Sequence, residues 1–171
     1  MSRFVTLVVS VSISLLCLAP FQVRTALAAG AVEMQVEHII SLSIEEYNQA
    51  MEAGDPDGWL KYFTDNVSRN GLLSAQTGKK EFSDYYRWEF KNFQAKYVVR
   101  KMLVHERSAA VVFLWDAVHK PSGSPLLLEM VALYEMGPSG KFESVSFYYD
   151  TAKAAKFFAV GDGSKQALDV R

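Results

Sequence analysis

Cysteine is almost absent from this sequence, since Cys17 is the only one among 171 residues. A single cysteine cannot form an intramolecular disulfide or supply the set of thiolates that a structural zinc site uses. An excess of basic residues is also absent, because 18 lysines and arginines stand against 19 aspartates and glutamates. This balance argues against nucleic acid as a partner. No metal-ligand spacing, phosphate-binding loop or nucleotide fingerprint is present, so we expect neither metal nor cofactor.

The N-terminus predicts export. Arg3 precedes an apolar run from Phe4 to Ala19, and residues 26–28 read Ala-Leu-Ala, a pattern that signal peptidase cleaves. The run is shorter than the roughly 20 residues that span a bilayer, so no stable membrane anchor is expected after cleavage. We predict a signal peptide over residues 1–28, one domain over 29–160 and a flexible tail over 161–171. The protein would then be periplasmic or secreted, and it would lose its only cysteine with the signal peptide.

Three helices are expected in the first half of the domain. Apolar residues recur every three or four positions from Val32 to Ala53, which predicts an amphipathic helix. Gly54 would stop it, and Asp55 or Asp57 would cap a short second helix that ends near Phe63. Residues 66–73 have the character of a short strand or an irregular stretch. A third helix, over residues 79–93, would carry an aromatic stripe.

The second half of the domain is strand-like. Four segments rich in β-branched and aromatic residues cover residues 97–106, 109–119, 126–136 and 142–149. The connections between them are too short for parallel crossovers, so antiparallel pairing is predicted. A short helix would follow from Asp150 to about Phe158. Helices followed by a meander of strands indicate an α+β fold, with the helices on one face of the sheet.

Both faces of the strand over residues 109–119 are rich in apolar side chains. Val111, Phe113 and Trp115 alternate with Val112 and Leu114. One face would cover the helices and line a cavity, and the other would be free to pack against a second copy of the chain.

Several short motifs resemble the nuclear transport factor 2-like superfamily, in its SnoaL-like polyketide cyclase and ketosteroid isomerase branch. The first motif, residues 47–65, contains Tyr47, the Ala-Gly-Asp triplet at 53–55 and the Asp-Gly pair at 57–58. The others are residues 77–82, 140–142 and 148–151. The resemblance spans roughly residues 36–158. It implies a cone-shaped, strongly curved antiparallel sheet, packed on about three N-terminal helices, with a hydrophobic pocket at one end. It also implies a homodimer.

The resemblance places Tyr47 where ketosteroid isomerases have a tyrosine that donates to the substrate oxyanion. The two carboxylates of those isomerases have no counterpart, because Asn70 and Ala132 stand at their positions. Neither residue can transfer a proton, so we do not expect ketosteroid isomerisation by that mechanism. Tyr47 would otherwise be a core aromatic residue.

Two aspartates are the remaining candidates for acid–base chemistry. Asp116 is either a general base among buried neighbours or a surface partner of Arg100 or Lys101. Asp150 corresponds to an acidic residue that some cyclases of the branch use, but it is also well placed to cap the last helix. The predicted catalytic residues are therefore Tyr47, Asp116 and Asp150.

Two functions remain open from the sequence. The first is an exported domain whose pocket binds a small apolar ligand without turnover. The second is an isomerase, cyclase or dehydratase that acts on a small cyclic carbonyl compound by proton transfer. In either case the predicted ligand-binding residues are Tyr62, Trp88, Trp115, Met130 and Tyr148.

Overall fold

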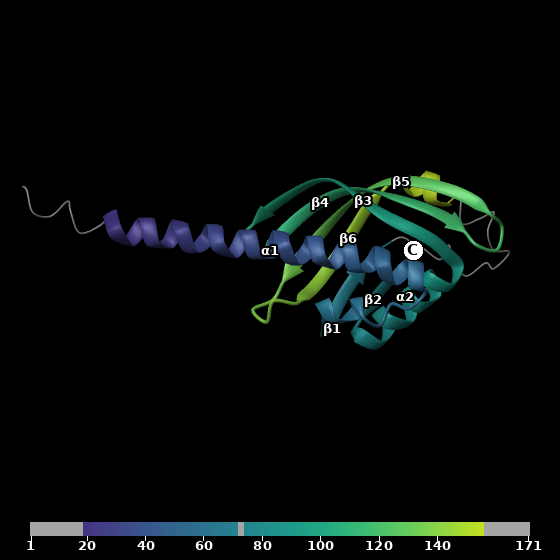
Figure 1. Cartoon of the computed structure of the whole chain (residues 1–171), viewed down its shortest axis with the longest axis horizontal. Helices are drawn as coiled ribbons and strands as arrows, with labels where there is room; N and C mark the ends of the chain where they lie inside the picture. Colours follow the sequence, from purple (N-terminus) through teal and green to yellow (C-terminus); the bar gives the residue numbers. More distant parts are fainter. Residues whose placement is uncertain (1–18, 72–73, 156–171) are drawn as a thin grey trace, which may run out of the picture.

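The computed structural model describes residues 19–71 and 74–155, and describes side chains from Gly30 onward. Its first element is the long helix α1, Ala19–Ala53. The residues of α1 that face the domain are buried: Val36, Ile40, Ile44, Tyr47 and Met51. This confirms the predicted amphipathic face. The helix begins earlier than its predicted start at Val32, within the predicted signal peptide, and its first turns extend beyond the sheet (Figure 1).

The helix α1 ends at Gly54, as predicted. Gly54 has a φ of 74°, and its N–H donates to the carbonyl of Met51. Glycine adopts this left-handed conformation at little cost, which makes it a common helix stop. The short second helix is the 3₁₀ helix η1, Trp59–Tyr62, preceded by Gly58 without a side-chain cap. The prediction that Asp55 or Asp57 caps it is wrong, because the Asp55 carboxylate accepts from the backbone of Asp57 instead.

Two strands and a helix follow. Strand β1, Phe63–Asn70, pairs antiparallel with the three-residue strand β2, Ala75–Thr77. The sequence indicated the first strand, although with later bounds, and gave no sign of the second. Helix α2, Lys79–Asn92, confirms the predicted third helix. Its inward face is aromatic, with Phe82, Tyr85, Tyr86 and Phe90 all buried.

The four long strands agree closely with their predicted ranges. They are β3 (Phe93–His105), β4 (Ser108–His119), β5 (Ser124–Met136) and β6 (Phe142–Tyr149), and each pairs antiparallel with the next. The sheet order is β2-β1-β6-β5-β4-β3. Because β1 runs parallel to β6, the sheet is mixed, and the expectation of a wholly antiparallel sheet is wrong in this one pairing. The chain passes through β2, α2 and three strands between β1 and β6, so the limit on short connections does not apply to that pair.

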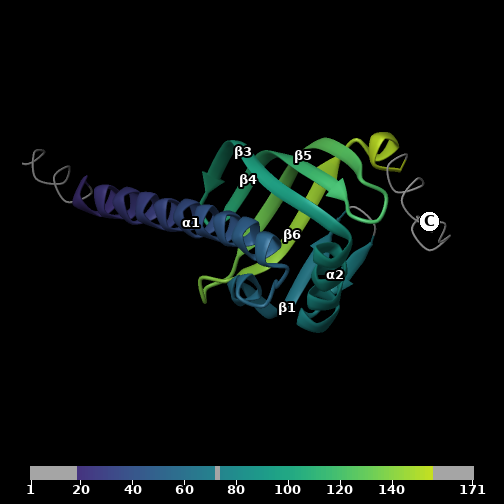
Figure 2. The same cartoon turned by 45° about the vertical axis from the view of Figure 1, so that its right-hand side comes forward.

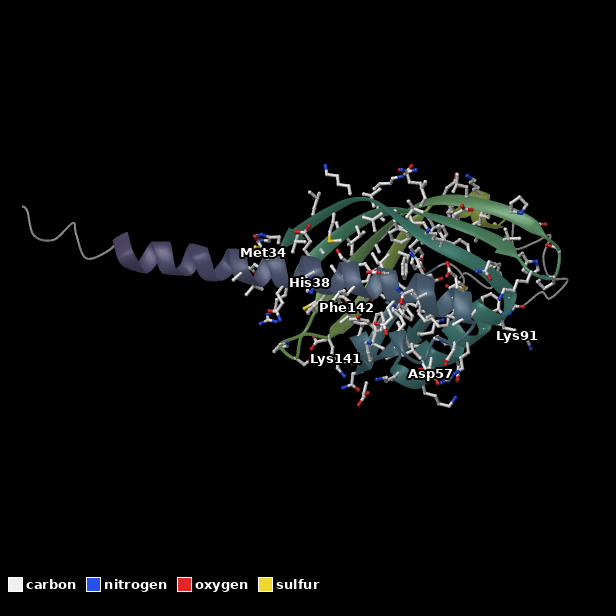
Figure 3. All side chains as sticks on the ribbon, in the orientation of Figure 1. Met34, His38, Asp57, Lys91, Lys141 and Phe142 are labelled. Carbon is white, nitrogen blue, oxygen red and sulfur yellow. The ribbon has the colours of Figure 1, made fainter. Side chains whose placement is uncertain are left out.

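The fold is α+β, with an open, curved sheet that has its helices on one side. Figure 2 shows α1 and α2 beneath the same concave face. Side chains fill the space between the helices and the sheet (Figure 3). On β4 and β5 the buried side chains come from alternate positions. The inward residues of β4 and β5 are nearly all fully buried, whereas the opposite face carries exposed Leu127, Leu133 and Tyr148.

The chain after the sheet is helical from residue 151 to 155. The Asp150 carboxylate accepts hydrogen bonds of 3.0 Å from the N–H groups of Ala152 and Lys153, which is the predicted capping role. The rest of the predicted last helix, the tail over residues 161–171 and most of the predicted signal peptide lie outside the described residues. Within the described part of the chain, no helix is both long and apolar enough to cross a membrane.

Candidate functional site

Tyr47 and Glu89 form a hydrogen-bonded pair at the centre of the core. The Tyr47 hydroxyl, from α1, donates to a carboxylate oxygen of Glu89, from α2, over 2.5 Å. Tyr47 is 0% exposed and Glu89 is 1% exposed. Four aromatic rings contact the Tyr47 ring, those of Trp59, Tyr86, Phe90 and Tyr97. A polar pair thus lies within an aromatic core.

Burial changes the proton affinity of both members of this pair. Desolvation raises the pKa of the Glu89 carboxyl, although the positive charge of Arg69 and the hydrogen bonds of Tyr47 and Tyr85 oppose the shift. Desolvation and the nearby Glu89 also raise the pKa of Tyr47 well above its usual value. A carboxyl group shifted in this direction is better suited to proton transfer near neutral pH than an exposed one.

Trp115 adds an unsatisfied donor beside the pair. Its indole Nε1–H lies near the Tyr47 hydroxyl and makes the smallest contribution to that pKa, in the direction that lowers it. The nitrogen is nevertheless buried and makes no hydrogen bond of good geometry with any described residue. An unpaired buried donor of this kind costs about 1–3 kcal/mol of stability.

Arg69 is the only fully buried basic side chain among the described residues, at 2% exposure. It comes from β1, near the turn into β2, and lies on the same side of the sheet as Tyr47. Its Nε donates to the Tyr86 hydroxyl over 3.2 Å, and its Nη1 donates to the carbonyl of Ser74 and to Oε1 of Gln76. Burial acts to lower the pKa of Arg69, but the negative potential of Tyr85, Tyr86 and Glu89 outweighs it, so the guanidinium stays charged.

The structure brings together only some of the residues predicted from the sequence. Tyr47, Trp115 and Met130 lie in the interior. Trp88 lies at its rim, 38% exposed, and its ring contacts those of Tyr85 and Phe93. Tyr62 is half-buried and lies near Glu46 on α1, where desolvation and a hydrogen bond to that carboxylate raise its pKa to about 12.

The other predicted site residues lie apart from Tyr47. Asp116 is exposed on the outer face of β4, where it is paired in register with Lys96 and Leu127. Asp150 is exposed and caps the last helix. Tyr148 is 57% exposed on the outer face. The predicted arrangement of Tyr47 with one of these aspartates is therefore not formed, because strand alternation turns Asp116 away from the core.

An open depression of about 480 Å³ lies on the outer side of the sheet. It is lined by Glu129, Tyr148, Asp150 and Lys153, together with residues of β4 and β5. This depression lies on the opposite side of the sheet from Tyr47. The described residues contain no group of histidine, cysteine and acidic side chains suited to hold a metal ion.

Sequence reasoning gave no role to Glu89 or Arg69. Glu89 falls within the predicted third helix, residues 79–93, and Arg69 falls within the predicted short strand or irregular stretch, residues 66–73. A charged residue at an otherwise apolar inward position is the sequence feature that would have identified Glu89.

Comparison with known proteins agrees with this architecture. A family model described as a SnoaL-like domain matches residues 44–145. No curated protein matches the sequence. Among solved structures, the fold is similar to SalBIII, an epoxide hydrolase/cyclase-like enzyme in pyran ring formation in polyether salinomycin. That match has a TM-score of 0.63 and 16% identity, and covers 71% of this chain and 95% of the other.

Two further structures are similar at comparable levels. A Jannaschia protein assigned as a SnoaL-like polyketide cyclase has a TM-score of 0.62 at 15% identity, with 78% of this chain and 96% of that one covered. A nuclear transport factor 2-like protein from Burkholderia xenovorans has a TM-score of 0.60 at 15% identity, with 72% and 95% covered. Identities this low show a shared fold and leave the chemistry to the residues of this chain.

Proposed function

The chain belongs to the SnoaL-like family, and we propose that it is a binding domain for a small, mostly apolar molecule. The observation that carries the proposal is the buried Tyr47–Glu89 pair with the unpaired indole N–H of Trp115 beside it. A ligand oxygen that reached these groups would accept a hydrogen bond that the protein alone does not satisfy. The surrounding aromatic rings supply apolar contact area.

The rim of the interior is the proposed point of entry. Trp88 is partly exposed there and packs against Tyr85, which is 9% exposed. Binding at this rim is distinguishable from binding at the outer depression, because each place has its own exposed aromatic residue. Trp88 belongs to the first and Tyr148 to the second.

A fluorescence titration with 2-naphthol and 2-naphthamide tests the proposal. We expect saturable quenching of tryptophan emission, weakened in Trp88→Phe and unchanged in Tyr148→Phe. Binding that Tyr148→Phe weakens and Trp88→Phe does not would place the ligand on the outer face. No saturable binding of either naphthalene compound, or of 2-naphthoate, would overturn the proposal.

An acid–base enzyme is the second candidate, and the raised pKa of Glu89 favours it. Glu89 would take a proton from the carbon next to a carbonyl group, and the electron pair of the broken C–H bond would form an enolate. Tyr47 and Trp115 would donate to the enolate oxygen, and Glu89 would return the proton to another carbon. Glu89 thereby replaces the predicted Asp116 and Asp150 in this role.

Deuterium exchange into 2-tetralone, followed by NMR in D₂O, tests the enzymatic alternative. Catalysed exchange should be lost in Glu89→Gln and kept in Asp116→Asn and Asp150→Asn. Exchange that no variant reduces below the wild-type rate, or no catalysed exchange at all, would remove this candidate and leave the binding proposal intact.

Export and dimer formation are further parts of the proposal. The apolar N-terminal run and the Ala-Leu-Ala motif support secretion with cleavage after Ala28.

The outer sheet face supports a homodimer, because exposed Leu103, Leu127 and Leu133 lie on it around the half-buried Leu114. Lys96 and Lys101 lie on β3, at one side of this face, and Glu129 lies on β5, across β4. A two-fold axis along β4 would place β3 of one copy over β5 of the other, so that opposite charges meet.

A further inference from the structure

Arg69 carries a buried positive charge that no carboxylate neutralises at close range. No described acidic group lies within 4 Å of the guanidinium, and its hydrogen-bond acceptors are the uncharged groups of Tyr86, Ser74 and Gln76. A buried cation is expensive unless a partner of opposite charge compensates it. The negative potential of Tyr85, Tyr86 and Glu89 favours the charge of Arg69, but no described carboxylate contacts the guanidinium directly.

The guanidinium is held rigidly between aromatic rings. Its central carbon lies 3.8 Å from the centre of the Tyr85 ring, 5.1 Å from that of Phe147 and 5.4 Å from that of Tyr86. Cation–π contacts of this kind favour the charge and fix the plane of the group. They leave the edge of the guanidinium available for hydrogen bonds.

Gly71 leaves room for the guanidinium of Arg69, because it has no side chain. A Cβ atom at residue 71 would lie 2.3 Å from the terminal carbon and both terminal nitrogens of Arg69. The side chain therefore occupies space that only glycine leaves open. Tyr149 secures the same turn by donating its hydroxyl to the carbonyl of Gly71.

The Nη2 group of Arg69 donates no hydrogen bond to any described residue. Every hydrogen bond that Arg69 makes with the described residues uses Nε or Nη1. The group also lies close to the surface, because Ser74 is exposed and Gly71 is half-buried.

We infer that Arg69 binds an anionic oxygen of the ligand, so that the natural ligand is a small aromatic or unsaturated carboxylic acid. The inference rests on the proposed binding function and names its ligand class. A ligand carboxylate would place a negative charge in direct contact with the guanidinium and accept from Nη2, and charge-assisted bonds of this type are stronger than neutral ones. The flat part of the ligand would lie along Tyr85 and Phe147, which flank the guanidinium.

The test compares two probes of equal size, 2-naphthoate and 2-naphthamide, by isothermal titration calorimetry with the full mature chain at pH 7. The acid is charged at this pH and the amide is not, whereas the apolar ring is the same. We expect the acid to bind about tenfold more tightly or better. Arg69→Gln should remove this preference, and Arg69→Lys should retain part of it.

Two controls keep the outcome clear if Arg69→Gln does not fold. The comparison of the two probes on the wild-type protein needs no variant. Gly71→Ala adds a methyl group that would displace the guanidinium of Arg69. It should reduce the preference for the acid while the protein remains folded by circular dichroism. Gly58→Ala is its matched control, because a Cβ there meets only one side-chain oxygen at 3.5 Å.

The possible results separate this inference from the proposed function. Equal affinities for acid and amide would overturn the role of Arg69 and leave the binding function standing. An acid preference that persists in Arg69→Gln would also overturn it, because another cation would then be responsible. If neither probe binds, the inference fails, and the binding function fails with it when 2-naphthol does not bind either.

Discussion

Asn48 and Tyr97 are joined by two hydrogen bonds that tie the long helix to the edge of the sheet. The side-chain amide of Asn48 donates to the Tyr97 carbonyl over 3.1 Å, and its oxygen accepts from the Tyr97 N–H over 2.9 Å. Strand β3 is an outer strand of the sheet, so these backbone groups have no neighbouring strand. The Asn48 side chain therefore gives the N–H and C=O groups of Tyr97 the hydrogen-bond partners that a further strand would otherwise supply.

Replacing Asn48 by alanine should lower the free energy of unfolding by about 1–3 kcal/mol, because both backbone groups of Tyr97 lose their partner. Asn48→Asp should fall between wild type and alanine, since it can accept from the N–H but cannot donate to the carbonyl. Urea denaturation measures the loss. Gln49→Ala, an exposed neighbour on α1, is the control. A loss no larger than that of the control would contradict the proposed tie.

Much of the fold was predictable because its elements are locally encoded. The alternation of β4 and the aromatic spacing of α2 appear in the sequence at the correct ranges. The parallel pairing of β1 with β6 was not predictable, since it joins residues 76 to 79 positions apart, such as Phe63 with Phe142 and Asn70 with Ser146, and depends on how the whole chain packs. The extent of β1 was missed for a similar reason. Its polar residues, Asp65, Asn66 and Arg69, give it weak strand propensity, and its neighbours in the sheet override this.

The candidate site was less predictable than the fold. Tyr47 was found through the family resemblance, and Trp115 through its position on a strand. Glu89 and Arg69 were missed because a sequence shows a charge but not its burial. The two aspartates drew attention as carboxylates near apolar residues, but register decides which side of a strand faces the core. Asp116 lies one residue beyond the buried Trp115 and faces outward.

Glu89 should make the protein less stable as the pH rises. Burial raises its pKa in the folded state above the value in the unfolded chain, so the folded state holds its proton more tightly between the two values. Stability should therefore fall as the pH increases from about 4.5 through the folded pKa, and this fall should be absent from Glu89→Gln. Urea denaturation from pH 4.5 to 8 measures it. Glu52→Gln, at an exposed position on α1, should keep the wild-type profile. A Glu89→Gln profile parallel to wild type would contradict the argument.

Gly71→Ala should destabilise the protein through Arg69. The new methyl group would displace the guanidinium from its rings and from Gln76, at a cost of about 1–3 kcal/mol. Thermal unfolding measures the change, with Gly58→Ala as the control. In the double variant with Arg69→Gln, the alanine at position 71 should cost less, because the shorter side chain leaves room for it. An equal cost in both backgrounds would show that strain in the turn, and not Arg69, is responsible.

Leu133→Arg should separate the proposed dimer. Leu133 is 40% exposed on the outer sheet face, in register with Ala110 of β4 and Ser146 of β6. A charge placed in the middle of this apolar surface would be desolvated on association without a partner, which should raise the dimer dissociation constant at least about tenfold. Sedimentation velocity over a range of concentrations measures this. Met34→Arg alters an exposed apolar residue on α1, at 67% exposure, and should leave the dimer unchanged. A wild-type protein that is monomeric at every concentration would rule out the dimer, and a dimer that tolerates Leu133→Arg but not Met34→Arg would move the interface from the sheet to the helix.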